Sequence, residues 1–254
     1  MLLLALKDIP GSMQIAPGQT FFEPNDDQRS IWLAQGYAKP ANEAVMTRDN
    51  SLDWTGAKVV IIASGPSLTT EQCAAVERWK VTPAKAPTRR VIVINTSFRL
   101  APFADILYAC DGAWWTKYYD EASVIFRQSQ MWTQDEPASR KFNLRYIKSA
   151  AGNGLSRKPG LIHQGMNSAY QSINLAYLLG ARDFVLLGVD CRGTHWHGDH
   201  PAPLNRALPH KQWIDRFRVL ARDLESDGAQ VVNCSPGTAL GTFRLGTLET
   251  ELAR

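Results

Sequence analysis

The stretch that decides the fold is VVIIASGPSL at residues 59–68. Four consecutive β-formers followed by small and polar residues are typical of a strand that is buried on both faces and ends in a turn. Thr69, Thr70 and Glu71 then have the composition of a helix N-terminus. The order of strand, turn and helix predicts one unit of a parallel sheet.

The turn in this unit is formed by Ser64, Gly65, Pro66 and Ser67. Backbone N–H groups at such a helix start face the carboxyl end of the strand, where phosphate binds readily. The turn is therefore a candidate phosphate site. A plain strand-to-helix connection, which a doubly wound protein contains many times, is the structural alternative.

Length and composition describe an ordinary globular chain. Its 254 residues can bury one α/β domain with a small appendage. A hydrophobic content of 44% with 20% charged residues excludes the disordered class. The net charge of +4 permits an anionic substrate or nucleic acid without requiring either, because no Lys/Arg run has the length of a binding tail.

Cysteine usage and apolar runs indicate a compartment. Cys73, Cys110, Cys191 and Cys234 lie far apart without CxxC spacing, so we expect free thiols in a reducing compartment. The opening MLLLAL is too short for the apolar core of a signal peptide, and no run reaches the roughly 20 apolar residues of a membrane span. We expect a soluble, cytoplasmic protein.

Residues 1–45 are rich in Pro, Gly and Asn, with short apolar pieces between them. This composition predicts a small β-rich N-terminal module with a helical turn at 27–35, followed by a linker. Its IAPGQTFFEPND and LAQGYAK segments resemble short modules of bacteriophage proteins, which would place the protein in the host cytoplasm. A hairpin that covers one edge of the main sheet is the alternative.

Residues 46–254 alternate between strand and helix patterns. This alternation predicts an α/β, Rossmann-like domain with a mostly parallel sheet and helices on both faces. Gly152, Gly154 and Pro159 predict a mobile loop. The expected elements are strands at 59–63, 91–95, 106–110, 184–190 and 229–234, weak strands at 130–133 and 144–148, and helices at about 69–80, 114–127, 167–179 and 210–226.

Polar side chains follow the predicted strands. They are Ser64, Asn95, Asp111, Asp190 and Asn233. In open α/β sheets ligands bind at this edge, so the repetition on successive strands predicts a binding site. The alternative is local, because Asn and Asp at strand ends often close turns by bonding their own backbone.

Histidines are concentrated in HWHGDHP at residues 195–201. Two imidazoles with His-x-His spacing can hold one metal ion, with Asp199 or His200 completing its coordination. No helix-borne zinc motif accompanies them, so we expect a solvent-exposed loop and assign no metal ligand. The imidazoles could instead contact phosphate or transfer protons. His210 follows Pro209 at a predicted helix start, a position that suits a general base.

Together these motifs resemble the sialyltransferases of glycosyltransferase family 42. They also resemble related proteins with a domain of unknown function, which include the archaeal hydroxymethyl-dihydropterin pyrophosphokinase. The similarity covers roughly residues 58–240 in short motifs. IIASGPSL looks like the family's Gly-Asn-Gly-Pro-Ser-Leu turn around the nucleotide, and LLGVD, which ends at Asp190, looks like its Ser-Gly-Ile-Asp strand end. Asn95 matches an asparagine that contacts the nucleotide in this family. Asp111 falls where the sialyltransferases have another asparagine.

The resemblance assigns two further positions and shows departures. Ser168 falls at the helix start that contacts the donor, and His210 falls where the family places its catalytic base. Ser64 replaces the asparagine of the turn. Arg192 and Gly198 stand at or near the two tyrosines that stabilise the departing phosphate.

The resemblance implies a transferase that uses a nucleotide-activated sugar donor of the CMP type as its co-substrate. His210 would deprotonate the acceptor hydroxyl, and Arg192 would stabilise the leaving phosphate. The acceptor would be a hydroxylated base in phage DNA or a surface glycan. One alternative is a Mg²⁺-dependent pyrophosphokinase that uses Asp111 and Asp190. The other is a non-catalytic phage nucleotide-binding protein, and the sequence leaves the oligomeric state, including a homo-oligomer, open.

Overall fold

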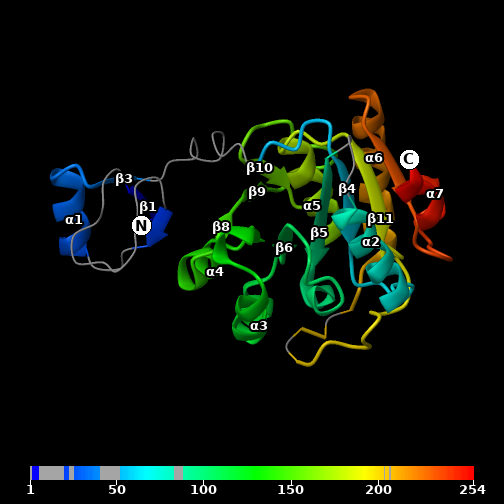
Figure 1. Cartoon of the computed structure of the whole chain (residues 1–254), viewed down its shortest axis with the longest axis horizontal. Helices are drawn as coiled ribbons and strands as arrows, with labels where there is room; N and C mark the ends of the chain where they lie inside the picture. Colours follow the sequence, from blue (N-terminus) through cyan, green and yellow to red (C-terminus); the bar gives the residue numbers. More distant parts are fainter. Residues whose placement is uncertain are drawn as a thin grey trace.

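The fold was analysed in a computed structural model of the chain (Figure 1). The structure describes residues 2–5, 20–22, 26–40, 52–82, 88–202, 204–205 and 207–254. Within these ranges, no helix combines the length and apolar character that a membrane crossing needs. All four cysteines are free, as expected, and Cys110 is the one that is partly exposed.

The N-terminal residues form a small unit of three antiparallel strands and one helix. The strands are β1 Leu2–Ala5, β2 Thr20–Phe22 and β3 Ala38–Pro40, in the order β2-β1-β3, and the helix is α1 Asp26–Ala34. The helix lies where the helical turn was predicted. These strands pair with one another, and none of the described ones joins the large sheet. The expected linker lies outside the described residues.

An eight-stranded sheet forms the centre of the rest of the chain (Figure 1). Every neighbouring pair in it is parallel, in the order β13-β12-β11-β4-β5-β6-β7-β8. The predicted parallel sheet is therefore confirmed. Its strands are β4 Lys58–Ile62, β5 Arg89–Ile94, β6 Ile106–Tyr108, β7 Met131–Thr133, β8 Arg145–Tyr146, β11 Asp183–Leu187, β12 Gln230–Asn233 and β13 Arg244–Leu245.

Helices cover both faces of this sheet. Because alternate side chains of a strand point to opposite faces, each strand contributes to two hydrophobic cores. Val59 and Ile61 of β4 belong to one core with side chains of α5 and α6, whereas Val60 and Ile62 belong to a second core with side chains of α2 and α3. The helices are α2 Thr70–Val81, α3 Gly112–Ile125, α4 Glu136–Phe142, α5 Ser168–Leu178, α6 His210–Ser226 and α7 Leu248–Ala253, with the 3-10 turns η3 Asn95–Arg99 and η4 Gln128–Gln130.

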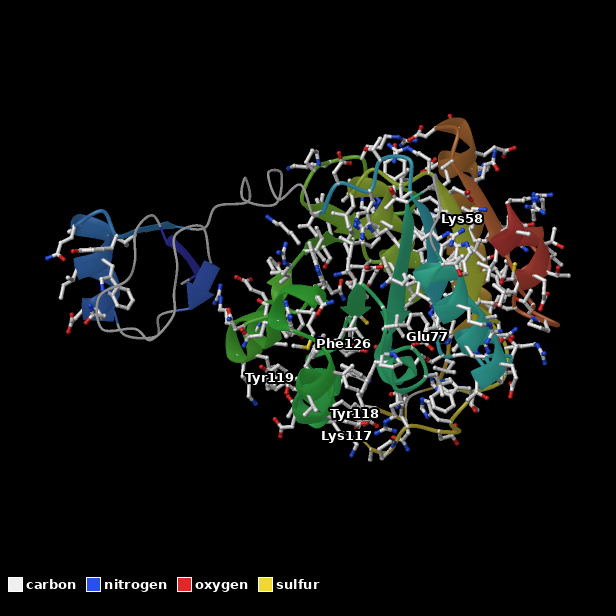
Figure 2. The ribbon with its side chains drawn as sticks, in the orientation of Figure 1. Lys58, Glu77, Lys117, Tyr118, Tyr119 and Phe126 are labelled. Atoms are coloured by element: carbon white, nitrogen blue, oxygen red, sulfur yellow. The ribbon has the colours of Figure 1, made fainter. Side chains whose placement is uncertain are left out.

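A buried lysine fastens the C-terminal helix to the first strand of the sheet. Lys58 is 4% exposed, and its Nζ donates a hydrogen bond of 2.9 Å to the carbonyl of Glu251 in α7 (Figure 2). The same Nζ lies 3.5 Å from a carboxylate oxygen of Asp183. The charge of this lysine is thus paired and hydrogen-bonded, as burial requires.

The order of strands reverses between β4 and β11. The chain runs from β4 outward to β8 on one side and returns to β11, β12 and β13 on the other. In open α/β sheets the crevice at such a reversal, beyond the carboxyl ends of the strands, is where ligands bind. The turn after β4 and the loop after β11 meet there.

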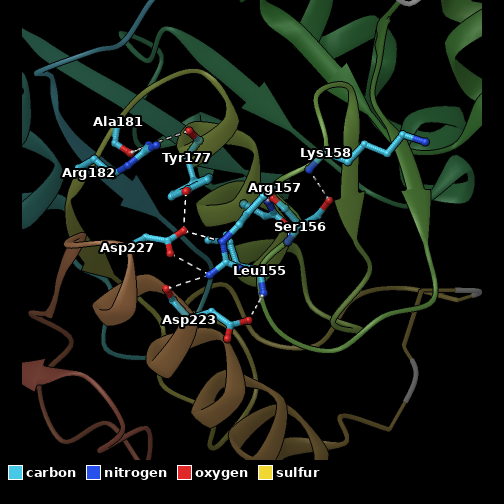
Figure 3. Close-up of polar contacts among 10 residues, drawn as sticks. Leu155, Ser156, Arg157, Lys158, Tyr177, Ala181, Arg182, Asp223 and Asp227 are labelled. Carbon is cyan, nitrogen blue, oxygen red and sulfur yellow. Dashed lines mark hydrogen bonds and ion pairs between the residues drawn. The ribbon is translucent and has the colours of Figure 1, made fainter.

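The loop at 151–160, for which the sequence predicted mobility, makes several polar contacts with neighbouring helices. It connects β9 Lys148–Ala150 with β10 Leu161–His163, which pair in a separate parallel sheet. Arg157 donates two hydrogen bonds of 2.7 and 2.9 Å to Asp227, which also accepts one of 2.6 Å from Tyr177 (Figure 3). These contacts tie the loop to α5 and to the end of α6.

Substitution of Asp227 tests this anchor. Arg157 and Tyr177 lower the pKa of Asp227 from 3.8 to about 2, so its stabilisation is present above pH 3.8 and is lost as the pH falls toward 2. At neutral pH we expect Asp227→Asn to cost about 1 kcal/mol, or about 2–4 °C in Tm, for this partly exposed group. Asp215→Asn, which removes an exposed pair with Arg218, is the control and should have a smaller effect. Equal Tm losses for both variants, or a deficit that persists at pH 2, would contradict the anchor.

Candidate functional site

A cavity of about 360 Å³ lies at the carboxyl ends of β4, β5 and β11, where the strand order reverses. Its volume falls in the range of roughly 300–1,000 Å³ that small-molecule sites have. Of the predicted site residues, Pro66, Ser67 and Asn233 do not line it. The lining ones are Ser64, Gly65, Asn95, Asp111, Ser168, Asp190, Arg192 and His210.

The turn after β4 packs directly against the end of β11. The N–H of Gly65 donates to the carbonyl of Gly188 at 2.8 Å. The N–H and the hydroxyl of Ser67 donate to the same oxygen of Asp190, at 3.3 and 2.9 Å. These two amides, which the sequence offered to a phosphate, therefore already have protein acceptors. The phosphate role of the turn stays a prediction.

Asp190 is the buried partner in this contact and is 2% exposed. Its Oδ2 accepts from Ser67, while its Oδ1 is buried without a hydrogen-bond partner among the described residues. Burial raises the pKa of Asp190, although the hydrogen bonds from Ser67 and the charge of Arg192 oppose this. The carboxylate therefore acts as an internal brace whose second oxygen is unused.

Gly65 is required by this close approach, and its substitution tests the contact. A Cβ at Gly65 would lie 2.0 Å from Asp190 Oδ2 and 2.5 Å from the Gly188 carbonyl oxygen. We expect Gly65→Ala to lower the free energy of unfolding by about 1–3 kcal/mol, because backbone must move.

Gly241→Ala is the matched control for Gly65→Ala. A Cβ there meets nothing within 4 Å, and its φ is not left-handed, so the change should stay within about 0.5 kcal/mol. Both values can be measured by urea unfolding. A Gly65→Ala protein as stable as the Gly241→Ala protein would contradict the contact.

Ser64 directs its hydroxyl into the protein. Its Oγ lies 2.8 Å from Ser97 Oγ and donates to the Ile94 carbonyl at 3.2 Å. Trp196 binds the same group, since its N–H donates to the Ser64 carbonyl and its indole Nε1 donates to Ser97 Oγ, both at 3.0 Å. Ser64 thus links the turn after β4 to the loop at residues 195–201, here called the histidine loop.

Three residues that line the cavity have a left-handed backbone. Asn95, Met166 and Cys191 have φ angles of 49°, 58° and 48°. Among the described residues other than glycine, the one further case is Asn143, which ends α4. Such backbone strain gathers at functional sites. Sequence reasoning missed Met166 and Cys191, because backbone strain leaves no pattern in residue type.

Asp111 stands at the start of α3 without capping it. Its side chain accepts no hydrogen bond from the first turn of the helix, and it is exposed at the cavity. Cys110 Sγ donates to it at 3.5 Å, and Ser168 Oγ donates to that sulfur at 3.1 Å. Burial raises the pKa of the Cys110 thiol to about 12, which favours its protonated form.

Arg192 and His210 provide the cavity with a cation and an imidazole. The guanidinium of Arg192 is exposed and donates to the Pro236 carbonyl at 3.5 Å, and it forms no ion pair within the part of the chain that the structure describes. His210 is the first residue of α6, as predicted, and its ring contacts Trp213 edge to face at 5.3 Å. Both groups remain available to a ligand.

Asn233 bonds groups near its own strand end instead of contributing to the cavity. It is 1% exposed, and its side chain donates to the Val189 carbonyl and to Thr238 Oγ1 and accepts from the N–H of Ser235. It does not line the cavity.

The histidine loop is more buried than expected. His200 is 9% exposed, and His195 and His197 are half-buried, so the expectation of a solvent-exposed loop is wrong for these three side chains. Burial lowers the pKa of each, in His200 to about 4, and repulsion from the neighbouring rings adds to the shift in His197 and His200. Asp199 is exposed and does not belong to the cluster.

Comparison of the chain with protein-family models, curated proteins and solved structures found no match.

Proposed function

We propose that this protein is a transferase that binds a nucleotide-activated donor, of the CMP-sugar type, in the cavity at the sheet edge. His210 removes the proton of an acceptor hydroxyl, and Arg192 neutralises the phosphate that leaves. The observation that carries the proposal is that one cavity at the reversal of strand order gathers the His210 imidazole, the Arg192 guanidinium and four strand-end polar residues.

The charges of the cavity favour a phosphate-bearing ligand. Arg192 forms no ion pair among the described residues, although its charge acts on Asp190, and Asp190 already accepts two hydrogen bonds from Ser67. Asn95 and Ser168 supply neutral hydrogen-bonding groups that suit a base or a ribose hydroxyl. The turn amides contribute less than the sequence suggested, so Arg192 becomes the main phosphate contact of the proposal.

Asp111 supports a second candidate, a Mg²⁺-dependent pyrophosphokinase. Its carboxylate is exposed at the cavity and is not used to cap α3, which suits a ligand of Mg²⁺. Asp190, the second carboxylate that the sequence offered, is a poor partner because Ser67 already binds one of its oxygens. Metal dependence of nucleotide binding separates the two candidates.

Calorimetric titration with cytidine, CMP, CDP, UMP, AMP and GMP tests the donor. We expect CMP to bind in the presence of a chelator and cytidine to bind more weakly. Absence of binding by every cytidine and uridine nucleotide would overturn the sugar-donor proposal. Binding that requires Mg²⁺, and that Zn²⁺ does not restore, would favour the pyrophosphokinase.

Two variants separate binding from catalysis. Arg192→Ala should weaken the binding of CMP but leave the affinity for cytidine unchanged, because only CMP carries the phosphate whose contact is lost. Arg218→Ala, an exposed position on α6 outside the cavity, is its control. His210→Gln should keep CMP binding and lower transfer by about 10²–10⁴-fold, as expected for loss of a general base. Full transfer activity in the His210 variant would exclude the assigned base.

A further inference from the structure

We propose that His195, His197 and His200 form a binding site for a divalent transition metal, with Zn²⁺ as the favoured ion. One nitrogen of each ring lies within 4.8 Å of a nitrogen of the other two. The inference concerns the histidine loop alone and does not depend on which ligand the cavity binds.

The rings face one another closely. The centroids of His195 and His197 are 5.2 Å apart with nearly parallel planes, and His200 lies 4.5 and 4.7 Å from them. His195 Nδ1, His197 Nε2 and His200 Nδ1 are fully buried and have no hydrogen-bond partner among the described residues. Buried polar atoms are normally satisfied, so three unsatisfied ones in a single cluster indicate a missing common partner.

Zinc fits this donor set. Imidazole nitrogen is a preferred ligand of Zn²⁺, and three protein ligands with one open position are the arrangement of catalytic zinc sites. With Zn–N bonds of about 2.0–2.1 Å, tetrahedral nitrogens lie about 3.3 Å apart, so nitrogens now within 4.8 Å of one another need to approach by at most about 1.5 Å. Ring rotation and the glycine between His197 and Asp199 allow such a movement.

The loop is held in a shape that presents these rings together. The N–H of Gly198 donates to the His195 carbonyl at 3.0 Å, which closes a turn and places His195 and His197 beside each other. Trp196, between them, is fastened to Ser64 and Ser97 by its backbone and its indole. A metal site needs this kind of rigid support for its ligands.

The cluster also has a place where the open coordination position would be useful. His195 and His200 line the cavity that holds Arg192 and His210. An ion bound by the three rings therefore lies in the cavity wall, where an oxygen atom of a ligand or a water molecule can take the fourth position.

Metal titration of the untagged, chelator-treated protein tests the inference. We expect one Zn²⁺ per chain, bound with a dissociation constant in the micromolar range or below by competition with a chromophoric chelator. Co²⁺ should give the intense visible bands of a tetrahedral site. His195→Gln and His200→Gln should each lower the affinity for Zn²⁺ by roughly 100-fold or more and abolish the visible bands of the Co²⁺ complex.

His163→Gln is the matched control, because His163 lies in β10 outside the cluster and bonds the Gly154 carbonyl. It should leave the Zn²⁺ affinity and the Co²⁺ spectrum unchanged. If the His200→Gln protein does not fold, as judged by circular dichroism, the metal titrations of His195→Gln and His197→Gln, which replace half-buried side chains, test the inference. Zn²⁺ affinity only in the millimolar range, or affinity that the cluster variants do not change, would overturn the inference.

Discussion

The contact between the turn after β4 and the carboxylate of Asp190 fixes the geometry of the whole sheet edge. Ser67 donates twice to one oxygen of Asp190, and Gly65 lies so close to β11 that no side chain fits there. Because β4 and β11 are the strands between which the chain order reverses, this contact sets the floor of the cavity. A carboxylate of the protein thus already accepts the Ser67 amide of this turn, just before the N-cap of α2.

A second set of hydrogen bonds, made by Ser97 and Trp196, attaches the histidine loop to the turn after β4. Ser97 receives the indole N–H of Trp196 and lies within hydrogen-bond distance of Ser64, while it donates to the Ala63 carbonyl. The loop after β11 is long, yet these bonds seat its first half on the same turn that Asp190 braces. The three imidazoles therefore lie on a loop that is anchored at Trp196 to the sheet edge.

Sequence patterns predicted the parts of this protein that depend on local order. The apolar run of β4 and the clean start of α6 at His210 were found because burial and helix periodicity are written in neighbouring residues. The short helix α4 was missed, since it begins at Glu136 with a proline in its first turn and little apolar periodicity. The strained Met166 and the convergence of the histidine rings could not be found, because both are set by tertiary contacts.

The charges of the cavity connect the two proposals. Of its acidic groups, Asp190 is buried and accepts two hydrogen bonds from Ser67, whereas Asp111 is exposed. A divalent ion held by neutral imidazoles adds two positive charges to this wall without any compensating carboxylate from the cluster. Such a wall attracts an anion much more strongly than Arg192 alone. Phosphate binding and metal binding are then coupled: each ligand should raise the affinity for the other, because each neutralises charge that the other leaves in the cavity.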